Sequence, residues 1–117
     1  MDIEKLRRHC LSKTGATEDF PFDESTLAFR IKGKMFCLTD LDKPDSINLK
    51  CDPEKAVELR EEHEEIIPGF HMNKRHWNTV DINGTLTDSF IFDLVDHSYD
   101  LVVKTLPRKL RAEIGKD

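Results

Sequence analysis

The chain has 117 residues, 38% hydrophobic and 35% charged, with a formal net charge of −5 at pH 7. This length and composition are typical of one globular domain with a single core, so we expect residues 1–117 to form one domain. No apolar run approaches the roughly 18 residues of a membrane span, and the N-terminus lacks a secretory signal, so we expect a cytoplasmic monomer that binds no membrane.

The N-terminal part of the chain predicts one helix followed by a loop. Apolar side chains recur at three- and four-residue steps, which predicts an amphipathic helix over residues 2–13. The acidic segment after it is interrupted by Pro21 and predicts a loop. We expect Phe20 and Phe22 to anchor this loop by packing on the core.

Three strands are predicted next, because apolar and polar residues alternate with the two-residue period of a half-buried strand. The first two, residues 26–32 and 35–39, lie on either side of Gly33 and therefore predict a hairpin. Residues 47–51 alternate in the same way and predict the third strand.

The second half of the chain begins with the clearest helix start in the sequence. Asp52 is a good N-cap, and Pro53 at the first helical position loses no needed donor. Two strands are predicted after this helix, a short one near residues 70–72 and a longer one at 77–82. Thr87 can cap a long helix that has the widest apolar stripe in the sequence.

The order of these elements predicts an α+β fold of two layers. Short strands joined by tight turns favour an antiparallel sheet of about five strands with helices on one face. The order is helix, three strands, helix, two strands and helix, and a short basic helix over residues 108–114 ends the chain. The expected core side chains are Phe29, Phe36, Leu38, Leu59, Phe90, Leu94 and Leu101.

The three cysteines, Cys10, Cys37 and Cys51, are odd in number and form no C-x-x-C pair. We therefore expect small core residues in a reducing compartment, rather than a disulfide framework or a zinc knuckle. The sequence also lacks a glycine-rich phosphate loop and an H-E-x-x-H zinc motif. We expect no cofactor, no metal and no enzymatic activity.

Charge is distributed unevenly along the chain. Residues 54–65 carry six glutamates against two bases, a net charge of −4, and residues 81–103 carry five aspartates and no base. Residues 66–80 have a net charge of +2, and residues 104–117 carry five bases against two acids, a net charge of +3. A nucleic-acid site would therefore be a local basic patch that acts against the field of acidic helices.

A set of short motifs resembles the MmcQ/YjbR family and covers the chain from about Gly15 to the basic C-terminal helix. In order, the motifs are Phe20-Pro-Phe22, Gly33-Lys-Met-Phe36, Leu49-Lys-Cys51, Pro68-Gly-Phe-His71, Asn73-Lys74 with His76-Trp77, and Ser98-Tyr99. The resemblance implies a compact α+β domain similar to secretion-chaperone-like and frataxin-like folds. It also implies DNA binding by a double wing, in which hairpins contact the duplex, and it supplies no catalytic residues.

The segment Lys74-Arg75-His76-Trp77 is the first candidate for nucleic-acid contact. Lys74 and Arg75 suit a phosphate backbone, and Trp77 could stack on a base or a sugar. Read as part of a strand, the segment would send Lys74 and His76 to one side and Arg75 and Trp77 to the other. The alternative is that Trp77 anchors the core while the two cations are solvated turn charges.

The tip of the first hairpin is the second candidate, because Arg30, Lys32 and Lys34 flank its glycine. Beside Lys74 and Arg75, this tip would complete a two-pronged basic surface that fits a groove of double-stranded DNA. The alternative is that these polar residues mark the solvated face of an antiparallel sheet. A third basic cluster consists of Arg108, Lys109 and Arg111.

These patterns support two functions, and a third would need a further observation. The chain is either a small DNA-binding domain that uses the basic hairpin and the Lys74–Trp77 loop, or a protein-interaction or chaperone-like module. Affinity that falls steeply with salt would indicate the first, and an exposed apolar patch would indicate the second. An enzyme or metal carrier would need a bound metal, for which His71 and His76 supply only two loop ligands.

Overall fold

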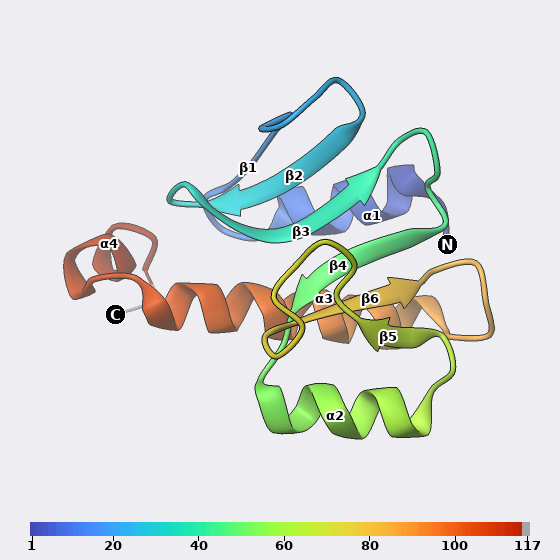
Figure 1. The fold of residues 1–117 in the computed structure, drawn as a ribbon. Helices are drawn as coiled ribbons and strands as arrows, with labels where there is room; N and C mark the ends of the chain where they lie inside the picture. Colours follow the sequence, from blue (N-terminus) through green and yellow to red (C-terminus); the bar gives the residue numbers. More distant parts are fainter. Residues whose placement is uncertain (116–117) are drawn as a thin grey trace.

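The computed structural model describes residues 1–115, which form four helices and a six-stranded sheet (Figure 1). The strand order is β1-β2-β3-β4-β6-β5, and every neighbouring pair is antiparallel. The elements are α1 (Ile3–Ser12), β1 (Ala16–Asp19), β2 (Thr26–Ile31), β3 (Lys34–Asp40), β4 (Ser46–Lys50), α2 (Pro53–Glu62), β5 (Ile66–Pro68), β6 (Trp77–Asp81), α3 (Asp88–Thr105) and α4 (Arg108–Glu113).

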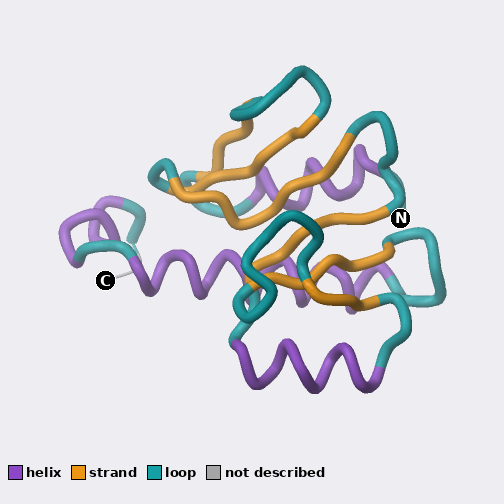
Figure 2. The backbone as a smooth tube through the Cα atoms, viewed as in Figure 1, coloured by secondary structure: helices purple, strands orange, loops and turns teal. Residues whose placement is uncertain are grey.

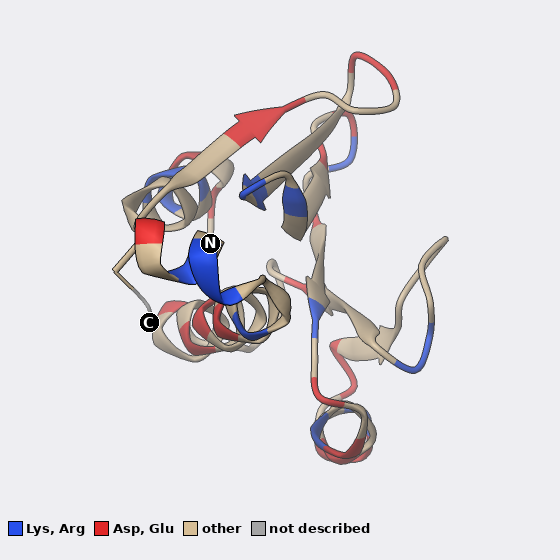
Figure 3. Cartoon of the chain, turned by 90° about the vertical axis from the view of Figure 1, so that its left-hand side faces the viewer, with Lys and Arg blue, Asp and Glu red and all other residues tan. Residues whose placement is uncertain are grey.

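The helices and the strands form two layers, as expected for an α+β fold. Figure 2 shows α1 and α3 running behind the strands, with α2 beside the edge strand β5. Within residues 1–115, the opposite face of the sheet carries loops but no helix (Figure 3). The predicted antiparallel sheet with helices on one face is confirmed, and we call the uncovered side the open face.

The core lies between the sheet and α3, where side chains alternate as predicted. In β2, Leu27, Phe29 and Ile31 are buried toward the helices. Ser98 of α3 ties the layers together, because its hydroxyl donates to the Phe36 carbonyl (2.5 Å) and accepts from the Lys50 N–H (2.9 Å). These buried polar contacts hold β3, through Phe36, and β4, through Lys50, to the helix α3.

Two helix starts and the cysteines follow the predictions. The Asp52 carboxylate accepts from the Lys55 N–H, and the Thr87 hydroxyl accepts from the Phe90 N–H. All three cysteines are buried and free. None of the helices in the described chain is both long enough and apolar enough to cross a membrane.

The sheet has one strand more than predicted, because β1 forms where a loop was expected. Its acidic side chains are paired: Glu18 Oε1 lies 2.6 Å from Arg7 Nη2, and Asp19 Oδ1 lies 2.8 Å from Arg30 Nε. Ion pairing with α1 and β2 thus allows an acidic segment to form an edge strand. Pro21 comes after the strand has ended, so its missing N–H interrupts no ladder.

The strand predicted near residues 70–72 was placed too late, since β5 ends at Pro68. The Phe70 N–H leaves the ladder and donates to the Thr79 hydroxyl (2.8 Å). His71 adopts a left-handed backbone with φ of 59°, which no strand accommodates. Residues 69–76 therefore form a loop between β5 and β6, and we call it the 69–76 loop.

Some side chains expected in the core lie elsewhere. Phe20 and Phe22 do not anchor their loop on the core, because 48% and 68% of their surfaces are exposed. Leu38 is buried on the open face, outside the core cluster, while Phe90 and Leu101 are only partly buried. The core placement of the other four, Phe29, Phe36, Leu59 and Leu94, is confirmed.

Candidate nucleic-acid interface

The strand directions bring two predicted basic segments to the same end of the sheet. β3 and β6 run in the same direction, because each is antiparallel to β4 between them. The β2–β3 turn precedes β3 and the 69–76 loop precedes β6, so both lie at one end, where β4 also finishes. Figure 3 looks at this end. We call it the basic end, formed by Lys32, Lys34, Lys50, Lys74 and Arg75.

The cations of the predicted hairpin tip are only partly available. Arg30 lies on the open face, where its guanidinium donates to Asp19 and to the Gly33 carbonyl (2.7 Å). The Lys32 ammonium lies 2.8 Å from a Glu113 carboxylate oxygen. Within residues 1–115, the Lys34 ammonium donates to the Thr105 hydroxyl (3.3 Å) and has no carboxylate partner.

The turn itself has the backbone of a tight hairpin. Ile31 pairs with Lys34, and the two residues between them, Lys32 and Gly33, have φ of 49° and 81°. Two successive positive φ values are the signature of a type I′ turn, whose twist matches that of the flanking strands. The turn is therefore a short, tight connection at the end of the sheet, and its lysines reach toward Glu113 of α4 and Thr105 of α3.

The second predicted segment, from Lys74 to Trp77, is a turn that leads into β6. The predicted strand alternation within it is therefore wrong, because the strand begins only at Trp77. Lys74 and Arg75 are exposed, His76 and Trp77 partly so. Trp77 is paired with Lys50 and lies outside the core cluster, so it does not anchor the core.

Four of these cations form no ion pair with any residue in the described part of the chain: Lys34, Lys50, Lys74 and Arg75. Lys50 was not among the predicted site residues. The sequence signal for Lys50 was its position in an alternating strand just before the start of a helix. Only the strand register shows that Lys50 pairs with Trp77.

The 69–76 loop is held in place from within. The Asn73 carboxamide oxygen accepts from the N–H groups of Arg75 (2.9 Å) and His76 (3.2 Å). The Lys74 ammonium donates to the Gly69 carbonyl (3.0 Å). A Cβ on Gly69 would lie 2.8 Å from the Cβ of Trp77, so only glycine permits this close approach.

Helix α2 holds the same loop from outside through Arg60. Its guanidinium donates to the Asn78 carboxamide oxygen (2.7 Å), to the Lys74 carbonyl and to the Trp77 carbonyl (3.4 Å). Asn78 is almost completely buried, so this contact also satisfies an interior acceptor. The loop is therefore a braced element rather than a loose one.

The opposite end of the sheet is acidic. The β1–β2 loop, the β3–β4 turn, the start of β5 and the end of β6 meet there. They carry Asp23, Glu24, Asp40, Asp42, Asp45, Glu65 and Asp81 against Lys43. Backbone hydrogen bonds from Thr26 and then Ser25 hold the pKa of Asp23 below its usual 3.8. The sheet is therefore electrically polarised along its strands.

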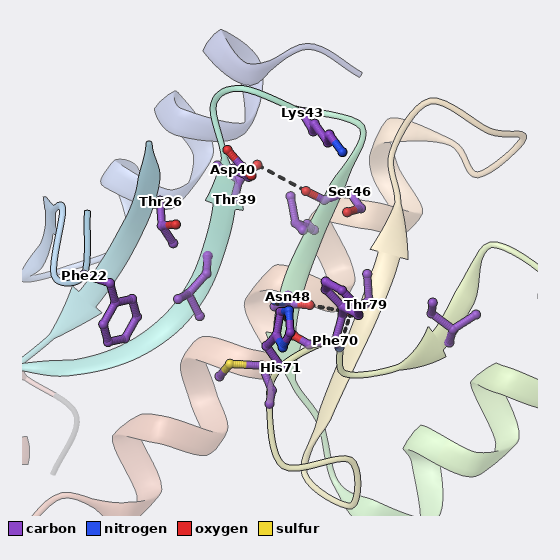
Figure 4. A pocket seen from close by; sticks show the side chains of 14 residues that line it. Phe22, Thr26, Thr39, Asp40, Lys43, Ser46, Asn48, Phe70, His71 and Thr79 are labelled. Atoms are coloured by element: carbon purple, nitrogen blue, oxygen red, sulfur yellow. Dashed lines mark hydrogen bonds between the residues drawn. The ribbon is translucent and has the colours of Figure 1, made fainter. Parts of the chain in front are cut away.

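A groove of about 560 Å³ lies on the open face between the two ends (Figure 4). Its floor is a cross-strand row in which Leu38 pairs with Asn48, Asn48 with Thr79, and Thr79 with Ile67. The side chains of Phe22 and Phe70 stand on opposite sides of it, with 68% and 62% of their surfaces exposed. We call this feature the open-face groove.

The 69–76 loop is fastened to the floor of the groove. The Thr79 hydroxyl accepts from the Phe70 N–H (2.8 Å) and donates to the Asn48 carboxamide oxygen (2.5 Å). The Asn48 amide donates weakly to the Phe70 carbonyl (3.4 Å).

No three His, Cys, Asp or Glu side chains of residues 1–115 gather closely enough to hold a metal ion. His71 lies in the groove wall, with its ring 4.0 Å from that of Phe70. The His76 carbonyl accepts from the Cys51 N–H (2.8 Å).

Comparisons with known proteins agree with the motif resemblance. A sequence model of the family called YjbR matches residues 11–101. The uncharacterized protein YjbR of Escherichia coli K12 is 35% identical over 112 residues, 95% of each chain. The crystal structure of Deinococcus radiodurans protein DR2400, from the domain DUF419, superposes with a TM-score of 0.92 at 38% identity, covering 99% of this chain and 89% of that one. The crystal structure of a Pseudomonas syringae protein superposes with a TM-score of 0.74 at 28% identity, covering 86% of this chain and 98% of that one.

Proposed function

The chain belongs to the YjbR family, and from the arrangement of its basic end we propose that it is a non-enzymatic domain that binds the backbone of double-stranded DNA. The observation that carries the proposal is the convergence of the β2–β3 turn, the end of β4 and the 69–76 loop on one end of the sheet. Each contributes at least one cation without a carboxylate partner within residues 1–115.

The placement of these cations supports phosphate contact more than their number does. Phosphates follow one another along a strand, so a binding surface needs cations spread over neighbouring elements rather than stacked on one. Lys34, Lys50 and Lys74 come from three different elements around the same end of the sheet. The acidic residues of the opposite end keep the favourable potential local, which limits the DNA footprint to the basic end.

A net charge of −5 makes the affinity moderate and dependent on salt. If four cations each displace counterions from phosphates, the logarithm of the affinity falls with the logarithm of salt with a slope of about −3.6. Between about 50 and 200 mM salt, the affinity then drops by roughly two orders of magnitude. Binding that ignores salt would contradict backbone contact.

The test uses a fluorescent duplex, anisotropy and three double charge reversals of equal size. Lys74→Glu/Arg75→Glu should abolish binding at low salt. Lys5→Glu/Arg8→Glu changes the net charge equally, but these exposed residues lie on α1 on the helical side, so binding should fall only slightly. Because Lys74 also braces its loop, Lys34→Glu/Lys50→Glu provides an independent reversal that should weaken binding as well. Equal losses in all three variants would mean that only net charge matters.

A protein-interaction module is the second candidate, because the open face exposes Phe22, Ile67 and Phe70 around one groove. Apolar patches of this kind often mark protein contacts. The two functions predict different responses: capture of a protein partner through this groove should depend on Phe70 and depend little on Lys34 and Lys50. Duplex binding should show the reverse pattern.

A further inference from the structure

We propose that the open-face groove receives unpaired nucleobases, so that the nucleic acid preferred by this domain has a short single-stranded segment beside the backbone held at the basic end. The inference rests on the proposed function and names the form of nucleic acid that the site takes. It follows from four features of the groove, which concern its aromatic walls, its rigidity, its floor and its polarity.

The walls of the groove carry aromatic rings that the fold itself does not use. Phe70 and Phe22 are exposed on opposite sides, and His71 packs its ring 4.0 Å from that of Phe70 (Figure 4). Bases of single-stranded nucleic acid bind proteins by stacking on such rings, with little dependence on sequence. The volume of about 560 Å³ is within the ordinary range for sites that take small flat molecules.

The backbone that carries the stacking wall is held in place before any ligand arrives. The backbone of Phe70 is bonded on both sides, to the Thr79 hydroxyl through its N–H and to the Asn48 amide through its carbonyl. His71 holds a left-handed backbone with φ of 59°. Such backbone strain at a residue other than glycine often occurs where a ligand is clamped. A rigid aromatic wall loses little conformational freedom on binding.

The floor of the groove offers a polar group to the edge of a base. The Asn48 carboxamide has two N–H donors, of which one contacts the Phe70 carbonyl at 3.4 Å. Asn48 is partly exposed and lines the groove, so its second N–H can reach a base carbonyl or ring nitrogen. Beside Asn48 and Thr79, the floor consists of Leu38 and Ile67, whose apolar side chains suit a base plane rather than a phosphate.

Charge complementarity sets the direction and length of the bound strand. The basic residues Lys50, Lys74 and Arg75 lie at one end of the groove, while Asp23, Asp40 and their acidic neighbours lie at the other. Phosphates held at the basic end place the attached bases over Phe70, whereas continuing along the groove toward Asp40 would bring phosphates to carboxylates. The domain therefore binds a short segment, of the order of four nucleotides, at the small end of the range for single-strand sites.

The test compares a blunt hairpin duplex with the same duplex carrying an unpaired tail, by anisotropy at about 50 mM salt. Wild type should bind the tailed probe more tightly. Phe70→Ala should lower affinity for the tailed probe about tenfold, the loss expected for one stacked base, and should leave the blunt probe unaffected. Phe70→Tyr should retain tight binding. Phe20→Ala is the matched control, because Phe20 is an exposed aromatic that does not line the groove.

Three results would overturn the inference. If Phe70→Ala changes neither probe while Lys74→Glu/Arg75→Glu still weakens both, the groove takes no base, although the proposed function stands. If Phe70→Ala weakens both probes equally, the ring only supports the loop. If Phe70→Ala abolishes a dimer seen by sedimentation, without any preference for the tailed probe, the groove is covered by a second copy of the chain. Failure of wild type to bind the blunt probe would instead refute the proposed function.

Discussion

Replacing Arg60 by methionine tests whether the basic end is a preformed surface. The substitution keeps the long aliphatic stem but removes three hydrogen bonds, those to Asn78, Lys74 and Trp77. Asn78 would then retain a buried carboxamide oxygen with no partner, and the 69–76 loop would lose its only brace from α2 within residues 1–115.

The magnitude follows from these contacts. Leaving a buried acceptor unsatisfied costs about 1–3 kcal/mol, and a hydrogen bond to a charged donor contributes about 1.5–3 kcal/mol. The Lys74 carbonyl is exposed and can return to water, and the Trp77 carbonyl keeps the Gly69 N–H (2.9 Å) as a partner, so only the Asn78 contact counts fully. We expect Arg60→Met to lower the free energy of unfolding by about 1–3 kcal/mol.

Urea unfolding followed by circular dichroism measures this loss, with an unchanged m-value showing that only stability has changed. Arg8→Met on the exposed face of α1 is the matched control and should shift stability by less than about 0.5 kcal/mol. Arg60→Met should also weaken DNA binding by loosening the loop. A loss of stability no larger than that of the control would refute the idea that Arg60 braces the basic end.

Three further predictions concern the core and the helix pair α1–α3. Ser98→Ala should cost about 2–4 kcal/mol in urea unfolding, because it leaves a strand carbonyl and a strand N–H buried without partners; a loss below that of an exposed Ser12→Ala control would contradict this. Burial alone would raise the pKa of Asp96, but hydrogen bonds from Lys13 and His9 outweigh it and hold the pKa below 3.8. This pairing therefore stabilises the fold above pH 3.8 and is lost as pH falls, so the stability difference between wild type and Asp96→Asn should shrink under acid. Burial is the largest effect on the Cys51 thiol and raises its pKa to about 11, although the positive charge of Lys55 acts to lower it. The thiol should therefore react with a disulfide reagent more slowly than that of a free cysteine.

The elements that could be predicted from sequence are those with strong periodicity or a cap. Asp52-Pro53 and Thr87 begin helices because one side chain satisfies a local N–H, a contact that needs no knowledge of the rest of the chain. The strand β1 could not be found in this way. Its stability depends on Arg7 and Arg30, which reach it only after α1 and β2 have been placed.

The candidate site was predictable in its cations but not in its aromatic walls. Lys74 and Lys34 could be identified as basic turn residues, and only the strand directions show that they share one end of the sheet. Phe22 and Leu38 were assigned to the core, since a large apolar side chain in a sequence carries no sign of which face of a sheet it takes. The groove exists because the open face has no helix over it within residues 1–115, a property of the assembled fold.

The most direct test of the central claim is a titration of the ¹⁵N-labelled protein with a short duplex, followed by heteronuclear NMR. Binding at the basic end predicts that the largest shift changes fall on the amides of Lys34, Lys50 and Lys74 and on the indole N–H of Trp77. Amides of α1 and of the acidic β3–β4 turn should move little. Changes centred on α1 or on the acidic end, or no change at about 50 mM salt, would contradict the proposed interface.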